Sequence, residues 1–237
     1  MIFFCANIVR GEKHSHCETN CRNEKGLVIM YPEIRQQDAK NLFELLKKAA
    51  QTFGDKNFLR YEENYIETEK SYRETYADSL KIAHWAADAG KSAGHRLRAA
   101  LLGRTGYEYL VTLFGVLGGN GLAIPLDIQL SNENMVKNLD KADTDVLFYD
   151  WEFRSQVTYI MEHCKTIKKF ICLQDVKGSD TVAEILSAPD TDAPLPEINP
   201  DECALIIFTS GTTGNAKGVM LSHANRKTTD IINKWRH

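Results

Sequence analysis

The chain is organised around one stretch, Phe208-Thr209-Ser210-Gly211-Thr212-Thr213-Gly214-Asn215-Ala216-Lys217-Gly218. The apolar run Ala204–Phe208 leading into it is typical of a buried strand. Glycines let the following loop approach a ligand closely, and successive backbone N–H groups in such a loop can form a concave anion site. Lys217 adds a positive charge, and hydroxyl donors come from Thr209, Ser210, Thr212 and Thr213. The sequence therefore predicts a strand followed by a phosphate-binding loop.

This loop differs from the common P-loop, which has the pattern Gly-x-x-x-x-Gly-Lys-Ser/Thr. Ala216 precedes the lysine and Gly218 follows it, so no hydroxyl stands after Lys217 to bind magnesium. The alternative interpretation is a glycine-rich surface loop without a ligand. Three glycines, four hydroxyls and a lysine gathered behind one strand favour the phosphate site.

The stretch resembles the phosphate-binding signature of the adenylate-forming superfamily, which includes acyl-CoA synthetases, luciferases and the adenylation domains of peptide synthetases. The family pattern is Thr-Ser-Gly-Thr-Thr-Gly-x-Pro-Lys-Gly-Val, followed by a segment like Leu-Ser-His-x-Asn. The chain departs from it at Ala216, where the family usually has proline; this loses loop rigidity but no ligand group. The matching positions are Thr209–Gly214, Lys217–Val219, Leu221–His223 and Asn225.

A second segment, residues 117–127, resembles the family pattern Leu-Lys-Ala-Gly-Ala-x-x-x-Pro-Leu-Asp. Gly118 replaces the usual lysine and Asn120 the usual glycine, while Leu117, Pro125, Leu126 and Asp127 match. We interpret this segment as a helix end, a short strand and a turn with a structural role. The resemblance extends from about residue 31 to residue 225.

The alternation of strands and helices predicts an α/β fold, doubly wound around a largely parallel sheet. We expect a helix from a cap at Asp38 to Phe53, ended by Gly54, and then a hairpin of residues 57–61 and 65–71. A helix over residues 72–89 is broken by Gly90 and Gly94. Further expected strands are 96–102, 145–149 and 169–173, and further helices are 107–117, 131–141, 153–164 and one starting at Ser222 or His223.

Residues 175–201 are rich in Asp, Pro and Ser, and we expect a surface connector there. We expect residues 1–35 to be an irregular leader and residues 36–237 to form part of an N-terminal AMP-binding domain. His14, His16, Cys17 and Cys21 lie close together, but their spacing matches no common zinc site. Met30 is an alternative start, since the resemblance begins just after it.

Composition excludes several classes of protein. A net charge of −3 gives no case for nucleic acid binding. No apolar run reaches the roughly 18–20 residues that span a bilayer, and the apolar opening lacks the basic residues of a signal peptide. Six scattered cysteines indicate a reduced, cytoplasmic setting, with the last three as small core residues: Cys164, Cys172 and Cys203.

The resemblance implies a ligase that uses ATP, Mg²⁺ and coenzyme A. A carboxylate attacks the α-phosphate of ATP, and the acyl adenylate passes its acyl group to a thiol. The loop is expected to hold the β- and γ-phosphates, with Gly211, Gly214 and Gly218 allowing it to move. The expected phosphate-binding residues are Thr209, Ser210, Gly211, Thr212, Thr213, Gly214, Lys217 and Gly218.

The resemblance also places much of the machinery further along the chain than His237. The adenine-binding segment, the magnesium-binding glutamate, the ribose-binding aspartate and the C-terminal lysine of the family are not in this sequence. We therefore assign no catalytic residue and no metal ligand, and we expect the chain alone to be inactive. Fatty acid is the favoured substrate. The alternatives are an adenylation domain that loads a carrier protein, and a non-catalytic remnant left by a frameshift or an early stop.

Overall fold

The computed structural model describes residues 3–4, 39–63, 66–209 and 217–224, and it is built on a six-stranded sheet. The strand order is β7-β6-β4-β5-β8-β9. The first five strands in this order run parallel, and β9 runs antiparallel to β8. Their bounds are β4 Arg98–Leu102, β5 Leu122–Pro125, β6 Val146–Tyr149, β7 Lys169–Cys172, β8 Cys203–Thr209 and β9 Lys217–Ser222.

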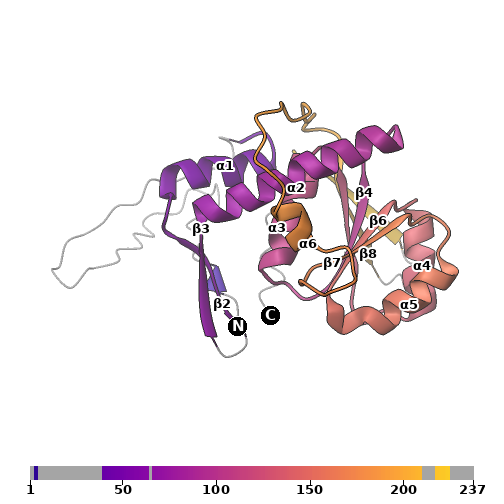
Figure 1. Cartoon of the computed structure of the whole chain (residues 1–237). Helices are drawn as coiled ribbons and strands as arrows, with labels where there is room; N and C mark the ends of the chain where they lie inside the picture. Colours follow the sequence, from indigo (N-terminus) through magenta and orange to yellow (C-terminus); the bar gives the residue numbers. More distant parts are fainter. Residues whose placement is uncertain (1–2, 5–38, 64–65, 210–216, 225–237) are drawn as a thin grey trace, which may run out of the picture.

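Helices cover both faces of this sheet, which confirms the doubly wound α/β class (Figure 1). One face is covered by α1, α2 and α3, and the other by α4 and α5. The helix bounds are α1 Leu42–Phe53, α2 Tyr72–Ala93, α3 Tyr107–Gly118, α4 Asn132–Lys141, α5 Arg154–His163 and α6 Val182–Leu186, with a 3₁₀ turn, η2, at Trp151–Phe153.

The alternation of side chains along β4 explains how one sheet serves two cores. Ala99 and Leu101 join the cluster under α1, α2 and α3, whereas Ala100 and Leu102 join the cluster under α4 and α5. All four are fully buried. Neighbouring strand residues point to opposite faces, so a strand covered on both sides is apolar throughout.

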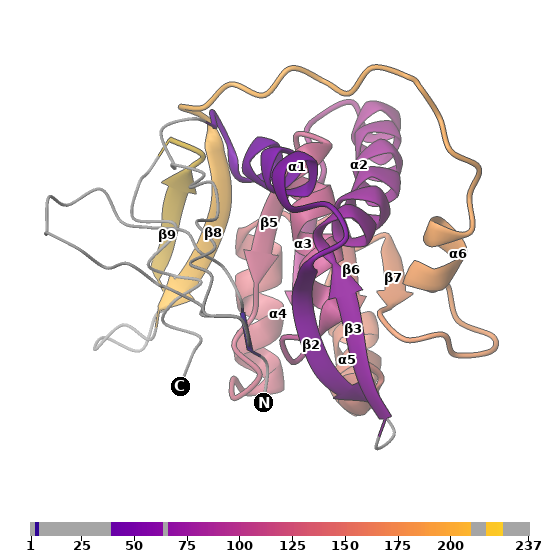
Figure 2. The same cartoon turned by 90° about the vertical axis from the view of Figure 1, so that its left-hand side faces the viewer.

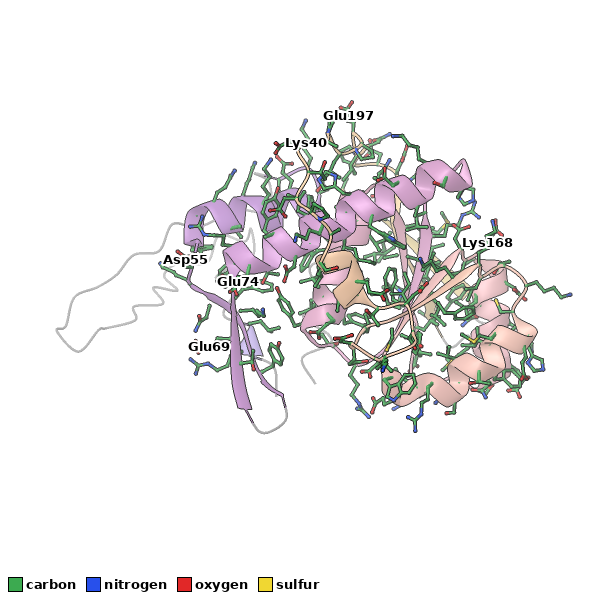
Figure 3. The ribbon with its side chains drawn as sticks, viewed as in Figure 1. Lys40, Asp55, Glu69, Glu74, Lys168 and Glu197 are labelled. Carbon is green, nitrogen blue, oxygen red and sulfur yellow. The ribbon has the colours of Figure 1, made fainter. Side chains whose placement is uncertain are left out.

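Helix termini follow the expected capping chemistry with two corrections. The first helix is capped by Asn41, whose side chain accepts from the Glu44 N–H; the predicted cap, Asp38, lies outside the described residues. Ser71 and Glu74, the latter labelled in Figure 3, form a capping box at the start of α2. The predicted break at Gly90 is wrong, because α2 continues to Ala93 and ends at left-handed Gly94.

The space around Gly90, and not a left-handed backbone, leaves no room for a side chain. A Cβ there would lie 3.0 Å from the His95 carbonyl oxygen and 3.1 Å from the Leu97 nitrogen, so the glycine lets the chain turn closely from α2 toward β4. Gly118 is similar: a Cβ there would lie 2.6 Å from the Phe43 ring. The aromatic ring of α1 therefore occupies the space that a larger residue at 118 would need.

The predicted hairpin is confirmed as β2 Asn57–Glu63 and β3 Ile66–Ser71, which extend a small antiparallel sheet with β1 Phe3–Phe4. Figure 1 shows this hairpin to one side of the main sheet. The Tyr61 and Tyr107 rings stack with centroids 6.3 Å apart, which packs the hairpin against the start of α3.

The segment between β7 and β8 is more structured than expected. It contains α6, which begins with a capping box of Thr181 and Glu184. Lys81 of α2 donates to the Leu186 carbonyl oxygen at 2.8 Å. Beyond α6 the chain arches over the molecule to β8 (Figure 2). The proline-rich composition of the segment favoured an irregular connector over this short helix. The Thr-x-x-Glu spacing, which is typical of a capping box, could have predicted it.

The three cysteines of the described part are free. Cys172 is fully buried in the core, as predicted, while Cys164 and Cys203 are only half-buried. Burial raises the pKa of the Cys172 and Cys203 thiols. Both groups are therefore held as neutral thiols, which are poor nucleophiles.

Candidate phosphate-binding site

The β8–β9 hairpin brings the two ends of the signature loop together. Thr209, the last residue of β8, pairs directly with Lys217, the first residue of β9. The Thr209 hydroxyl donates to the Lys217 carbonyl oxygen at 3.5 Å, and both residues are exposed. The intervening predicted site residues lie outside the described part of the chain: Ser210, Gly211, Thr212, Thr213 and Gly214.

The position of this hairpin turn suits a ligand site. Because β8 is parallel to β4, β5, β6 and β7, Thr209 lies at the edge where all five strands have their carboxyl ends. Open α/β sheets bind ligands outside the carboxyl ends of their strands. Thr209 and Lys217, the described residues on either side of the loop, therefore lie on the side of the sheet where this class of fold places its ligands.

Gly218 lies in β9 and not in the loop, which changes the reason for its being glycine. It pairs with Phe208, and a Cβ at this position would lie 3.3 Å from Cε1 of that ring and 3.1 Å from Cγ2 of Ile206. The glycine leaves room for the side chains of β8. The predicted contribution of Gly218 to loop movement is replaced by this packing role.

The predicted helix after the loop also needs correction at its start. Val219, Met220 and Leu221 belong to strand β9, which ends at Ser222, and His223 lies in a turn. The rest of the expected helix falls outside the described residues. The glycine-rich segment thus connects two antiparallel strands. The apolar residues 219–221 suit a strand as well as a helix, because a short apolar run does not distinguish the two.

Arg96, which nothing in the sequence pattern marked, ties the base of this hairpin to the sheet. Its Nε donates to the Asn120 carbonyl oxygen at 2.8 Å, and its Nη2 donates to the Cys203 carbonyl oxygen at 2.8 Å. Its Nη1 lies 3.2 Å from Oε2 of Glu202. Arg96 thereby links residues that precede β4, β5 and β8.

His223 lies beside this arginine at the far end of β9. Its ring is buried, and neither ring nitrogen has a hydrogen-bond partner among the described residues. Burial, together with the positive charge of Arg96, lowers the pKa of His223 to about 4. The imidazole is therefore neutral at physiological pH.

The donor set at the turn fits a phosphate group. Lys217 forms no ion pair with another described residue, so no carboxylate in that part of the chain competes for its charge. The described residues contain no group of three His, Cys, Asp or Glu side chains placed to hold a metal ion. His14, His16, Cys17 and Cys21, whose spacing matches no common zinc site, lie outside the described part of the chain.

Comparison with known proteins identifies the family. The family described as AMP-binding enzyme matches residues 46–235, which is most of the chain. The chain belongs to the AMP-binding enzyme family. The match contains both segments of the predicted resemblance, the one at residues 117–127 and the signature loop.

Members of the AMP-binding family with related sequences include a long-chain-fatty-acid–CoA ligase from Thermus thermophilus, 26% identical over 195 residues. A fatty acid–[acyl-carrier-protein] ligase from Streptomyces coeruleorubidus is 29% identical over 153 residues. These matches cover 81% and 65% of this chain but only 35% and 28% of the two relatives. The chain thus spans about a third of their length.

A solved fatty acyl CoA synthetase from Mycobacterium tuberculosis has the same fold over this region, with a TM-score of 0.63 and 22% sequence identity. The match covers 78% of this chain and 35% of that structure. In the part of our chain that the structure describes, no helix has the length and apolarity that crossing a membrane requires.

Proposed function

We propose that this chain forms the N-terminal part of an AMP-forming acid–thiol ligase and that its β8–β9 turn binds the β- and γ-phosphates of ATP. The observation that carries the proposal is the direct pairing of Thr209 with Lys217 at the carboxyl edge of the sheet. A hydroxyl donor and a lysine charge flank the glycine-rich loop on its two sides. Membership of the AMP-binding family supports the same ligand.

The proposed reaction has two steps. A carboxylate oxygen attacks the α-phosphorus of ATP, and the bond between that phosphorus and the bridging oxygen breaks, releasing pyrophosphate. A thiol then attacks the acyl carbon, forming a thioester and releasing AMP. Lys217 would stabilise the negative charge that develops on pyrophosphate. Mg²⁺ would accompany ATP as a further positive charge, with its protein ligand expected outside this chain.

A fatty acid is the proposed carboxylate, since the names of the Thermus and Streptomyces relatives both specify one. Coenzyme A is the proposed acceptor. Loading of an acyl carrier protein is the second candidate, because the Streptomyces relative is named for that acceptor. Free thiols at all three described cysteines support a reducing, cytoplasmic setting.

The first test measures binding of inorganic tripolyphosphate and of ATP to the 237-residue chain by isothermal titration calorimetry. Lys217→Ala should weaken tripolyphosphate binding by roughly tenfold, the effect of losing one charge-assisted hydrogen bond. Lys168→Ala is the matched control, because Lys168 is exposed at the opposite edge of the sheet, just before β7 (Figure 3). Equal losses of tripolyphosphate affinity in the two variants would contradict the assignment of Lys217 to the phosphate site.

The second test concerns catalysis. We expect ATP–pyrophosphate exchange by the 237-residue chain to stay at background, since the chain spans about a third of its relatives. Exchange above background would show that this portion carries out adenylation by itself. In a full-length protein containing this chain, the thioester product formed with coenzyme A or with an acyl carrier protein would decide between the two acceptors.

A further inference from the structure

Strand β8, which leads into the proposed phosphate loop, joins the parallel strands through β5. Its register with β5 consists of one pair, Ala123 with Leu205. By contrast, β4 pairs with β5 and with β6 through four residues each. Side-chain bonds near this pair therefore add to the joining of β8 and β5.

The side chain of Arg96 supplies these bonds at the amino end of β8. Its three hydrogen bonds reach carbonyl oxygens of Asn120, Gly121 and Cys203, at 2.8, 3.4 and 2.8 Å. Cys203 is the first residue of β8, and the other two directly precede β5. One guanidinium thus joins the two strands next to their single registered pair.

The same arginine lies close to the end of β9. Cys203, whose carbonyl oxygen accepts from Arg96, pairs with Ser222 at the end of β9, and the Ala224 N–H donates to the Pro200 carbonyl oxygen at 2.7 Å. Glu202, which pairs with Arg96, lies between that proline and β8. Both ends of the hairpin, the entry to β8 and the exit from β9, therefore meet around Arg96.

We propose that Arg96 is a positioning residue for the phosphate site: it holds the base of the β8–β9 hairpin so that Thr209 and Lys217 stay at the carboxyl edge of the sheet. This inference rests on the proposed binding of phosphates by the loop. The role requires the planar fork of a guanidinium, because one lysine ammonium cannot bond carbonyls in these separate directions and a carboxylate as well.

The test compares Arg96→Lys with Arg98→Lys in the 237-residue chain. Arg98 is a matched control because its side chain bonds Asp143 and, among the residues that the structure describes, bonds none of the hairpin. Hydrogen exchange followed by mass spectrometry should show roughly tenfold faster exchange in residues 203–209 and 217–222 of Arg96→Lys, with residues 98–102 and 146–149 unchanged. Tripolyphosphate affinity should fall about three- to tenfold. Arg98→Lys should change neither the hydrogen exchange of the hairpin nor the affinity for tripolyphosphate.

Four outcomes would contradict the inference or the proposed function. Faster exchange throughout the sheet of Arg96→Lys would indicate a general structural role and overturn the inference, as would unchanged exchange in the hairpin. Faster exchange in the hairpin with unchanged tripolyphosphate affinity would also overturn it, because holding the hairpin would then not matter for the site. If the wild-type chain binds no tripolyphosphate, the proposed function fails, and the exchange data still decide whether Arg96 holds the hairpin.

Discussion

At the scale of single residues, His223 combines burial with two ring nitrogens that have no partner among the described residues. A protonated imidazole at this place would be poorly solvated and would face the Arg96 charge. The residue is therefore tolerated only in its neutral form, and this makes the hairpin sensitive to acid.

His223→Gln should make stability less dependent on pH. The pKa of His223 is about 4 in the folded chain and 6.5 in a solvated histidine. Between these values the unfolded state binds more protons, so the wild-type free energy of unfolding falls as pH decreases from about 6.5 toward 4. Between pH 7 and pH 5 we expect the wild type to lose on the order of 1 kcal/mol more than the variant, since residual water contact lessens the penalty.

Urea unfolding at pH 7, 6 and 5 measures this difference directly. His84→Gln serves as the control, since His84 is only half-buried on α2. If wild type and His223→Gln lose stability in parallel as the pH falls, then His223 is not the group that titrates.

Residue types in sequence were enough to place Thr209 and Lys217 in one glycine-rich segment that follows a strand, and the structure pairs these two residues across β8 and β9. The role of Arg96 could not be predicted, since its partners come from residues 120, 121 and 203 and meet only in the folded sheet. The packing of Gly218 against Phe208 was hidden for the same reason.

At the scale of elements, β9 is the edge strand of the described sheet and carries exposed apolar side chains. Met220 is 67% exposed and Val219 43% exposed. Such an edge presents unpaired backbone groups together with apolar surface, and proteins commonly protect such edges with charged residues. This strand has no charged residue after Lys217.

Met220→Lys should therefore reduce self-association of the 237-residue chain without a large change in stability. A lysine on an edge strand opposes pairing with another chain. Met161→Lys is the control, because Met161 is 52% exposed but lies on helix α5, where no strand edge is available. Sedimentation velocity at increasing protein concentration measures the monomer fraction. A wild-type chain that stays monomeric, or equal effects of the two lysines, would contradict the assignment of β9.

Long periodic elements were predicted well, since α1, α2, α3, α4 and the parallel strands each carry a clear apolar pattern. Short elements were not. Helix α6 spans only five residues in a proline-rich segment. Strand β9 is also short, and it ends at Ser222, where a helix was expected to start. Local propensity is weak over such lengths, and packing against neighbouring elements decides the outcome.

At the scale of the whole molecule, the sheet is shared by two core clusters on its opposite faces. Leu101 and Leu102 are adjacent in β4, fully buried, and belong to different clusters. Since both clusters are built on the same backbone, neither face can be lost without disturbing the other.

Leu101→Ala and Leu102→Ala should each lower the free energy of unfolding by about 2–5 kcal/mol, the usual cost of removing a buried leucine. Both should shift one common transition, seen at the same urea concentration by circular dichroism and by tryptophan fluorescence. Met161→Ala, at an exposed position, should cost less than about 0.5 kcal/mol. Separate transitions by the two probes would show that the two faces unfold independently.

The pairing of β5 with β8 also has a consequence for the order of folding, because the two strands are far apart in the sequence. As the chain is synthesised, β4, β5, β6 and β7 emerge first and can pair with one another, whereas β8 must wait until the long stretch between Pro125 and Cys203 has been added. Contacts over such a separation form late because closing the intervening chain costs entropy. We therefore expect β8 and the proposed phosphate loop to join a preformed scaffold, and pulse-labelling during refolding should find residues 203–209 protected after residues 98–102.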